Sequence, residues 1–160
     1  LMTRAIPGGE GYPKFEECYA CFRQHYLHHN LDTTAPYPGI MEMLKTLMDN
    51  GRQVAVVSNK FYEATQDLVR HFFPDIKVAI GERPDIHKKP APDTVNEALR
   101  QLGMPRQTAV YIGDSDVDIE TARNSGMPCI SVLWGFRDRE FLLEHGATTL
   151  VSAPNEILKL

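Results

Sequence analysis

Three aspartates lie within five residues in the C-terminal half of the chain. Asp114, Asp116 and Asp118 follow a short apolar run, 109–112, and Gly113 separates the run from the acids. Such a run is typical of a buried parallel strand, so the carboxylates should lie at its carboxyl end, where open α/β sheets bind ligands. Acids this close repel one another unless a cation lies between them, and their oxygens suit Mg²⁺. The alternative is that Asp116 and Asp118 only cap the helix that follows, and that Asp114 alone has a further role.

A hydroxyl and an amide end another predicted strand. Ser58 and Asn59 follow the continuous β-branched run 54–57. Side chains of these types can hydrogen-bond a phosphate oxygen without adding charge. The same dipeptide also begins turns, so taken alone it leaves a turn equally open.

Two lysines stand just ahead of a predicted helix. Lys88 and Lys89 precede the Pro-Ala-Pro-Asp segment 90–93. An ammonium group there can neutralise the charge that builds up between a carboxylate nucleophile and a phosphoryl group. Asp118, one helical turn after Asp114, could orient either Lys89 or Asp114. The alternative is a pair of solvated surface charges, a description that suits Lys88 better than Lys89.

These polar groups require an alternating α/β framework to bring them together. The apolar patterns predict strands at 54–57, 77–80, 109–112, 129–133 and 148–151, and helices at 38–50, 61–72, 92–102, 116–126, 138–145 and from 154 onward. Strands that alternate with helices form a parallel sheet with right-handed crossovers. Ahead of them, residues 1–13 resemble a loop and residues 14–30 a helix, and the prolines at 36 and 38 end that helix. We therefore place a domain boundary between residues 34 and 35.

Composition limits the classes of function. The chain has 160 residues, of which 42% are hydrophobic and 24% charged, and a net charge of −4. These values are ordinary for a globular domain and provide no basic surface for nucleic acid. Because no run reaches membrane-spanning length and residues 1–10 lack a signal-peptide pattern, we expect no membrane partner. Three cysteines, an odd number, favour free thiols and a cytoplasmic location.

One helix carries four possible metal ligands. Cys18, Cys21, His25 and His28 fall on a single stripe of the helix predicted at 14–30. A straight helix cannot wrap four ligands around one zinc, so a metal site would need further ligands from elsewhere. We favour a packed face on which cysteine acts as a small hydrophobic residue.

Taken in order, the motifs resemble the haloacid dehalogenase superfamily. The matching segments are Val-Ser-Asn-Lys at 57–60, Lys-Pro-Ala-Pro-Asp at 89–93 and Gly-Asp-Ser-Asp-Val-Asp at 113–118. Within it, the segments 36–40, 118–126 and Trp134–Phe136 are most similar to the phosphoglycolate phosphatase branch. The resemblance implies a Rossmann-like three-layer α/β/α core at 35–160 with an inserted helical cap, of which 1–34 would be a remnant.

The resemblance also implies a reaction and a set of site residues. The activity would be Mg²⁺-dependent hydrolysis of a phosphomonoester, with an aspartate nucleophile that forms an aspartyl-phosphate. Ser58 would bind the phosphoryl group with Asn59 beside it, and Lys89 would bridge nucleophile and phosphate. Asp114 would bind Mg²⁺, and Asp118 would support the site. The substrate would be a small phosphorylated metabolite, and phosphoglycolate is the best single candidate.

The family's first motif does not occur in the chain. A strand followed by Asp-x-Asp-Gly-Thr should precede the cap, and no such segment is present. Asp114 and Asp116 have the right spacing, but Val117 and Asp118 follow in place of Gly-Thr, so we do not assign them this role. We therefore expect the C-terminal portion of a longer phosphatase that lacks the central strand of its sheet and has at most trace activity alone.

Other functions stay open. A sheet without its central strand should self-associate through the gap or be only marginally stable. Within the superfamily, the alternatives are a phosphosugar mutase similar to β-phosphoglucomutase and a dehalogenase; the acid cluster argues for a metal and so against the dehalogenase. A non-catalytic binding or regulatory module is the alternative from another class.

Overall fold

The computed structural model describes residues 2–160, which fall into two compact units. The first unit ends at Ala35 and the second is Pro36–Leu160. The first contains α1 (Met2–Ala5), the 3₁₀ turn η1 (Gly9–Gly11) and α2 (Phe15–His29). Residues 2–13 were expected to form a loop, but α1 and η1 occur there. Helical turns this short are closed by local backbone bonds and leave no periodic apolar pattern in the sequence.

Helix α2 carries the cysteine and histidine stripe. Its aromatic side chains stack along the helix, with Phe15 on Tyr19 and Phe22 on Tyr26. All three cysteines of the chain are free thiols. Within residues 2–160, no group of three or more His, Cys, Asp or Glu side chains is arranged to hold a metal ion. The stripe of Cys18, Cys21, His25 and His28 therefore makes no such cluster by itself.

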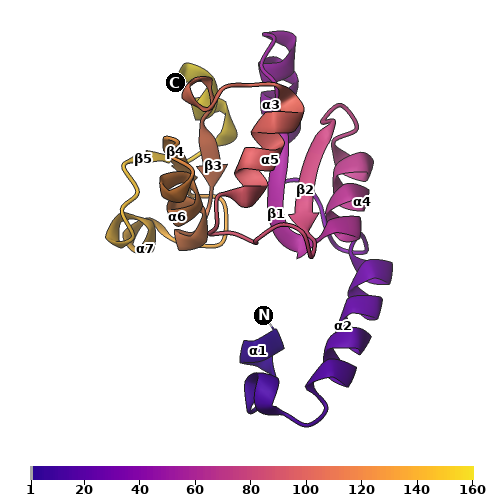
Figure 1. The fold of residues 1–160 in the computed structure, drawn as a ribbon. Coiled ribbons are helices and arrows are strands. Elements are labelled where there is room, and N and C mark those ends of the chain that lie inside the picture. The colour runs from indigo at the N-terminus through magenta and orange to yellow at the C-terminus, as the bar shows by residue number, and fades with distance from the viewer. Residues whose placement is uncertain (1) are drawn as a thin grey trace. The chain divides into compact units, whose positions relative to one another are not determined.

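The second unit alternates helices with strands as predicted (Figure 1). Its elements are α3 (Ile40–Asp49), β1 (Ala55–Phe61), α4 (Tyr62–Phe72), β2 (Val78–Glu82), α5 (Asp93–Leu102), η2 (Arg106–Thr108), β3 (Tyr111–Gly113), α6 (Asp116–Asn124), β4 (Cys129–Val132), α7 (Arg139–Glu144), β5 (Thr149–Val151) and η3 (Pro154–Lys159). Every ladder between these strands is parallel, which confirms the predicted α/β class with parallel strands.

The strands form two sheets rather than one. The first pairs β1 with β2, and the second has the order β3-β4-β5. Among the described residues no ladder joins β1 to β3, so each of these strands pairs on one side only. Beside this interruption, Val110 and Ile112 are 46% and 39% exposed, unusually open for apolar residues in and next to a strand.

Helices on both faces hold the two sheets together. On one face, Leu44 of α3 packs against the cluster of Ile130 and Val132 and also against the cluster of Val69 and Ala79. On the other face, Val57 of β1 contacts one cluster that contains Ala98 and another that contains Val95, Tyr111 and Ala122. The apolar core is thus continuous across the interruption although the backbone ladder is not.

No helix within residues 2–160 combines the length and apolar character needed to span a bilayer.

Candidate active site

The acid cluster lies in the loop from β3 to α6. Ser115 is the N-cap of α6, and its hydroxyl donates to Asp118 Oδ2 at 2.6 Å. The same oxygen accepts from the backbone N–H of Asp114 at 3.2 Å. Asp118 therefore does stabilise the helix start, in a variant of the capping box. This is the simpler of the two roles that the sequence left open.

The other oxygen of Asp118 faces Lys89. Lys89 Nζ donates to Asp118 Oδ1 at 2.7 Å and to Tyr111 Oη at 3.2 Å. The Tyr111 hydroxyl donates to the same Oδ1 at 3.0 Å. Both ionic side chains are enclosed, with 13% of Lys89 and 7% of Asp118 exposed. The lysine is thus part of a buried network and not a solvated surface charge.

Electrostatics fix the protonation states in this network. Burial alone would raise the pKa of Asp118, but the charge of Lys89 and hydrogen bonds from Lys89, Ser115 and Tyr111 outweigh it and lower that pKa. Burial, together with the negative charge of Asp118, raises the pKa of the Tyr111 phenol above its usual value. The network at neutral pH therefore contains an ionised Asp118 and a neutral Tyr111.

Asp114 is held by the loop after β4. The backbone N–H of Phe136 donates to Asp114 Oδ2 at 2.8 Å. A Cβ at Gly135 would lie 2.2 Å from Asp114 Cβ, so only glycine allows this approach. Arg137 lies against the Phe136 and Phe141 rings, and its Nε is 3.6 Å from Asp116 Oδ1.

The donor set fits a hard cation at Asp114. Asp118 is committed to Lys89, and Asp116 is paired with Arg137. Asp114 is the carboxylate of this motif that has no cationic partner among the ion pairs of the described residues. Mg²⁺ is usually bound through one or two carboxylates, substrate phosphate oxygens and water, so Asp114 can supply one ligand of such a site. Its role in metal binding stays a prediction.

The end of β1 brings in the polar pair. Between Val57 and Phe61 the register with β2 shifts, because Val57 pairs with Ile80 and Phe61 with Glu82. The strand is therefore irregular between Val57 and Phe61, the segment that contains Ser58 and Asn59, and such a bulge re-aims side chains. Ser58 Oγ accepts from the backbone N–H of Lys60 at 3.1 Å. The Asn59 side chain pairs with the backbone of Lys89 through two hydrogen bonds.

The structure thus connects most of the predicted site residues. Asn59, Lys89, Asp118 and Asp114 form one chain of direct hydrogen bonds, and Ser58 precedes Asn59 on β1. Their catalytic and binding roles stay predictions. Sequence reasoning did not assign roles to Tyr111, Ser115, Gly113, Asn124 or the Gly135–Phe136 backbone, all of which contact this network or the loop that carries Lys89.

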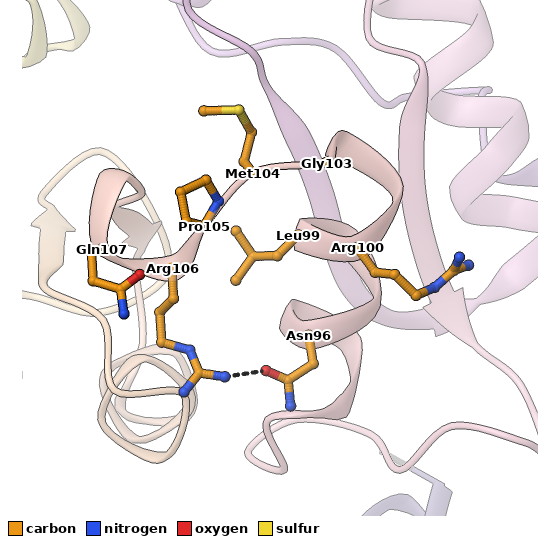
Figure 2. A pocket seen from close by; sticks show the side chains of 8 residues that line it. All are labelled: Asn96, Leu99, Arg100, Gly103, Met104, Pro105, Arg106 and Gln107. Atoms are coloured by element: carbon orange, nitrogen blue, oxygen red, sulfur yellow. Dashed lines mark hydrogen bonds between the residues drawn. The ribbon is translucent and has the colours of Figure 1, made fainter.

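One pocket of the structure lies away from this network. It measures about 630 Å³ and lies at the C-terminal end of α5 and at η2 (Figure 2). Because η2 precedes β3, the pocket lies toward the amino end of that strand, opposite the acid cluster. It is lined by Asn96, Leu99, Arg100, Gly103, Met104, Pro105, Arg106 and Gln107, none of which we predicted as a site residue.

Comparison with known proteins establishes the family. Residues 9–132 match the family model described as haloacid dehalogenase-like hydrolase. The chain belongs to the haloacid dehalogenase superfamily. Among curated members, a phosphoglycolate phosphatase from Aquifex aeolicus is 35% identical over 150 residues, which are 92% of this chain and 69% of that protein. The pyrophosphatase PpaX from Halalkalibacterium halodurans is 25% identical over 151 residues, with coverage of 92% and 69%.

Solved structures of the superfamily agree. A crystal structure from Lactobacillus delbrueckii subsp. bulgaricus, provisionally named a phosphoglycolate phosphatase, matches with a TM-score of 0.88 and 44% identity. The match covers 95% of this chain and 64% of that one. The chain thus falls in the phosphoglycolate phosphatase-like branch, and it spans between 62% and 69% of the length of the first curated relatives.

Proposed function

We propose that this chain supplies the lysine, the phosphoryl-binding hydroxyl and one metal ligand of a Mg²⁺-dependent phosphomonoester hydrolase of the phosphoglycolate phosphatase type. The observation that carries the proposal is the enclosed Lys89 ammonium, 2.7 Å from Asp118 and linked through that residue to Asp114. A fixed positive charge next to a metal-binding carboxylate suits a reaction in which negative charge builds up on phosphoryl oxygens.

Each side chain has a definite task in this proposal. Lys89 stabilises the negative charge between nucleophile and phosphoryl group, and Asp118 holds its ammonium in place. The Ser58 hydroxyl donates to a phosphoryl oxygen. Asp114 binds Mg²⁺, which supplies positive charge that polarises the phosphoryl group. Tyr111 closes the network from the core side and keeps water away from the Lys89–Asp118 pair.

The proposal places the nucleophile outside these 160 residues. The chain contains no Asp-x-Asp-Gly-Thr segment. Asp118 is neutralised by Lys89, and Asp116 is paired with Arg137, so neither is poised to attack phosphorus. From the family resemblance, the nucleophile strand would lie between β1 and β3, which no ladder joins among the described residues. We accordingly propose an aspartyl-phosphate on an aspartate of that strand, and treat residues 1–34 as part of a cap.

Relatives suggest the substrate class. The names of the similar proteins include phosphoglycolate phosphatase and pyrophosphatase, which both denote small phosphorylated substrates. A structure provisionally named β-phosphoglucomutase from Thermotoga maritima is 21% identical and supports the fold alone, so we rank the mutase below the phosphatase. We also propose a cytosolic location, since the three cysteines are free thiols.

Complementation tests the proposal. A segment with a β-strand and the Asp-x-Asp-Gly-Thr motif is fused ahead of Met2, and release of phosphate from phosphoglycolate and pyrophosphate is measured with and without Mg²⁺. We expect Mg²⁺-dependent activity in the fused protein and at most a trace in the chain alone. Asp114→Ala should abolish the restored activity, and Lys89→Met should lower it by about 10²- to 10³-fold.

The neighbouring lysine provides a matched control. Lys88 is 66% exposed and pairs loosely with Glu82 at 3.8 Å, so Lys88→Met should keep the restored activity. A folded fusion that hydrolyses neither substrate would favour the non-catalytic module. Turnover by the unfused chain that disappears in Asp114→Ala would show that the missing motif is dispensable.

A further inference from the structure

The backbone of Lys89 is held by a side-chain amide from another strand. Asn59 Nδ2 donates to the carbonyl oxygen of Lys89 at 2.9 Å, and the Lys89 N–H donates to Asn59 Oδ1 at 2.8 Å. An amide side chain offers a donor and an acceptor side by side, as a peptide group does. The pair therefore acts as one rung of a ladder between the bulged end of β1 and the loop that follows β2.

A second asparagine holds the next residue from the opposite side. Asn124, the last residue of α6, donates through Nδ2 to the carbonyl oxygen of Pro90 at 2.9 Å. The two asparagines come from different halves of the unit, since β1 belongs to the first sheet and α6 follows β3 of the second. The Lys89–Pro90 segment is thus anchored to both sheets across the interruption between them.

We propose that Asn59 is a positioning residue for Lys89, with Asn124 as the second anchor, and that neither contacts the phosphoryl group. A lysine side chain has four rotatable bonds, so the place of its ammonium depends on how firmly its Cα is held. The Asn59 oxygen and one of its N–H groups are already bonded to Lys89. This assignment gives Asn59 a different task from the phosphate binding that the family resemblance implied, and its catalytic meaning rests on the proposed function.

Chemical labelling tests the positioning without any need for activity. The chain is treated with a limiting amount of acetic anhydride, and acetylation of each lysine is followed by mass spectrometry. In the Asn59→Ala variant, Lys89 should react faster by about tenfold, the factor expected when one to two hydrogen bonds that hold it are lost. The reactivity of the exposed Lys88 and Lys45 should not change.

A matched variant separates positioning from a general loss of stability. Gln66 Nε2 donates to the backbone oxygen of Ala79 at 2.6 Å, which is the same kind of bond away from Lys89. Gln66→Ala should leave the labelling of Lys89 unchanged. Asn124→Ala, and Asn59→Asp, which keeps the acceptor but loses the donor, should each give intermediate acceleration. If Asn59→Ala does not fold, the labelling of Lys89 in Asn124→Ala and Asn59→Asp tests the positioning instead.

A cycle in the fused enzyme tests whether Asn59 acts through the lysine. Asn59→Ala should lower kcat, and adding it to Lys89→Met should cause no further loss. A further loss in the double variant, or unchanged Lys89 labelling in folded Asn59→Ala and Asn59→Asp, would overturn the assignment. Faster labelling in a fusion that hydrolyses no substrate would leave the positioning intact and reject the proposed function instead.

Discussion

Lys89 and Asp118 form the most enclosed ion pair among the described residues, with 13% and 7% of their side chains exposed and 2.7 Å between Nζ and Oδ1. The two residues come from different halves of the unit, Lys89 from the loop after β2 and Asp118 from α6. The pair therefore joins the two sheets at the edge where the site residues gather. Its loss should affect stability as well as chemistry.

Replacing Lys89 by methionine should destabilise the chain strongly. The variant keeps most of the apolar stem but leaves the buried Asp118 carboxylate without its cation. Removing one partner of a buried ion pair costs about 3 to 5 kcal/mol. We expect the lower end of this range, because Ser115 and Tyr111 still donate hydrogen bonds to Asp118. Urea unfolding followed by circular dichroism at pH 7 measures this loss.

The adjacent lysine again provides the comparison. Lys88→Met removes a charge that is 66% exposed and should change the free energy of unfolding by less than about 0.5 kcal/mol. Equal unfolding midpoints for the two variants would show that the Lys89–Asp118 pair contributes nothing to the fold.

Tyr111 should make the chain sensitive to alkaline pH. Burial and the Asp118 charge raise the pKa of its phenol in the folded state above that in the unfolded state. The contribution of Tyr111 to the free energy of unfolding is therefore fully present below the unfolded-state pKa of about 10 and is lost as the pH rises from there through the folded-state pKa. Tyr111→Phe should remove this dependence and cost about 1.5 to 3 kcal/mol at pH 7 through the lost bond to a charged acceptor.

Two measurements check the tyrosine prediction. Urea unfolding at pH 7 and pH 11 gives the free energy of unfolding of both proteins, and the difference between wild type and Tyr111→Phe should be smaller at pH 11. Absorbance at 295 nm should show the phenolate of Tyr111 only when the chain unfolds. A free-energy difference that is the same at both pH values would contradict the raised pKa of Tyr111.

A methyl group at Gly135 should displace the predicted metal ligand. The added Cβ would lie 2.2 Å from both Cβ and Oδ2 of Asp114, so the loop or the carboxylate must move. Overpacking of this kind costs about 1 to 3 kcal/mol. Gly135→Ala should therefore lower the urea midpoint and weaken Mg²⁺ binding measured by calorimetry.

Gly11 serves as the control for this substitution. A Cβ there would meet nothing within 4 Å, so Gly11→Ala should keep the wild-type midpoint. If Gly135→Ala binds Mg²⁺ as well as wild type does, the loop has moved and not Asp114, and Mg²⁺ binding that also survives Asp114→Ala would show that Asp114 is not the ligand.

The sequence predicted the framework well because apolar periodicity reflects burial directly. The run 54–57 indicated β1, but the strand continues to Phe61, since an extended bulge of polar residues leaves no apolar pattern. The contact between Asp118 and Lys89 is one of the two that the sequence left open, and it is present. Asp118 also bonds at the start of α6, so it caps the helix and contacts Lys89 at once, while its role in catalysis stays a prediction.

Contacts between distant segments explain what the sequence could not predict. Tyr111 looked like an ordinary strand residue, and its hydroxyl is significant only because Lys89, 22 residues away, folds against it. The bond from Asn124 to Pro90 spans 34 residues. The close approach of Gly135 to Asp114 likewise joins two separate loops. No local pattern encodes such pairings, which the tertiary fold alone creates.

The interruption between the sheets should make the chain self-associate. Within residues 2–160, β1 and β3 each present an unpaired edge, and Ile112 on β3 is 39% exposed. Open strand edges pair with other chains, and a charged side chain placed on such an edge opposes this pairing. Sedimentation velocity between low and high micromolar concentration should show a monomer that converts to larger species, and Ile112→Lys should move this conversion to higher concentration.

A similarly exposed apolar residue elsewhere distinguishes pairing of strand edges from non-specific hydrophobic association. Leu143 of α7 is 47% exposed, and Leu143→Lys adds the same charge away from the interruption. This variant should associate as wild type does, because its strand edges are unchanged. The fused protein, which supplies the proposed nucleophile strand, should stay monomeric, since that strand would pair with both edges. Association that persists in the fusion, or that Leu143→Lys weakens as much as Ile112→Lys, would place the contact outside the gap.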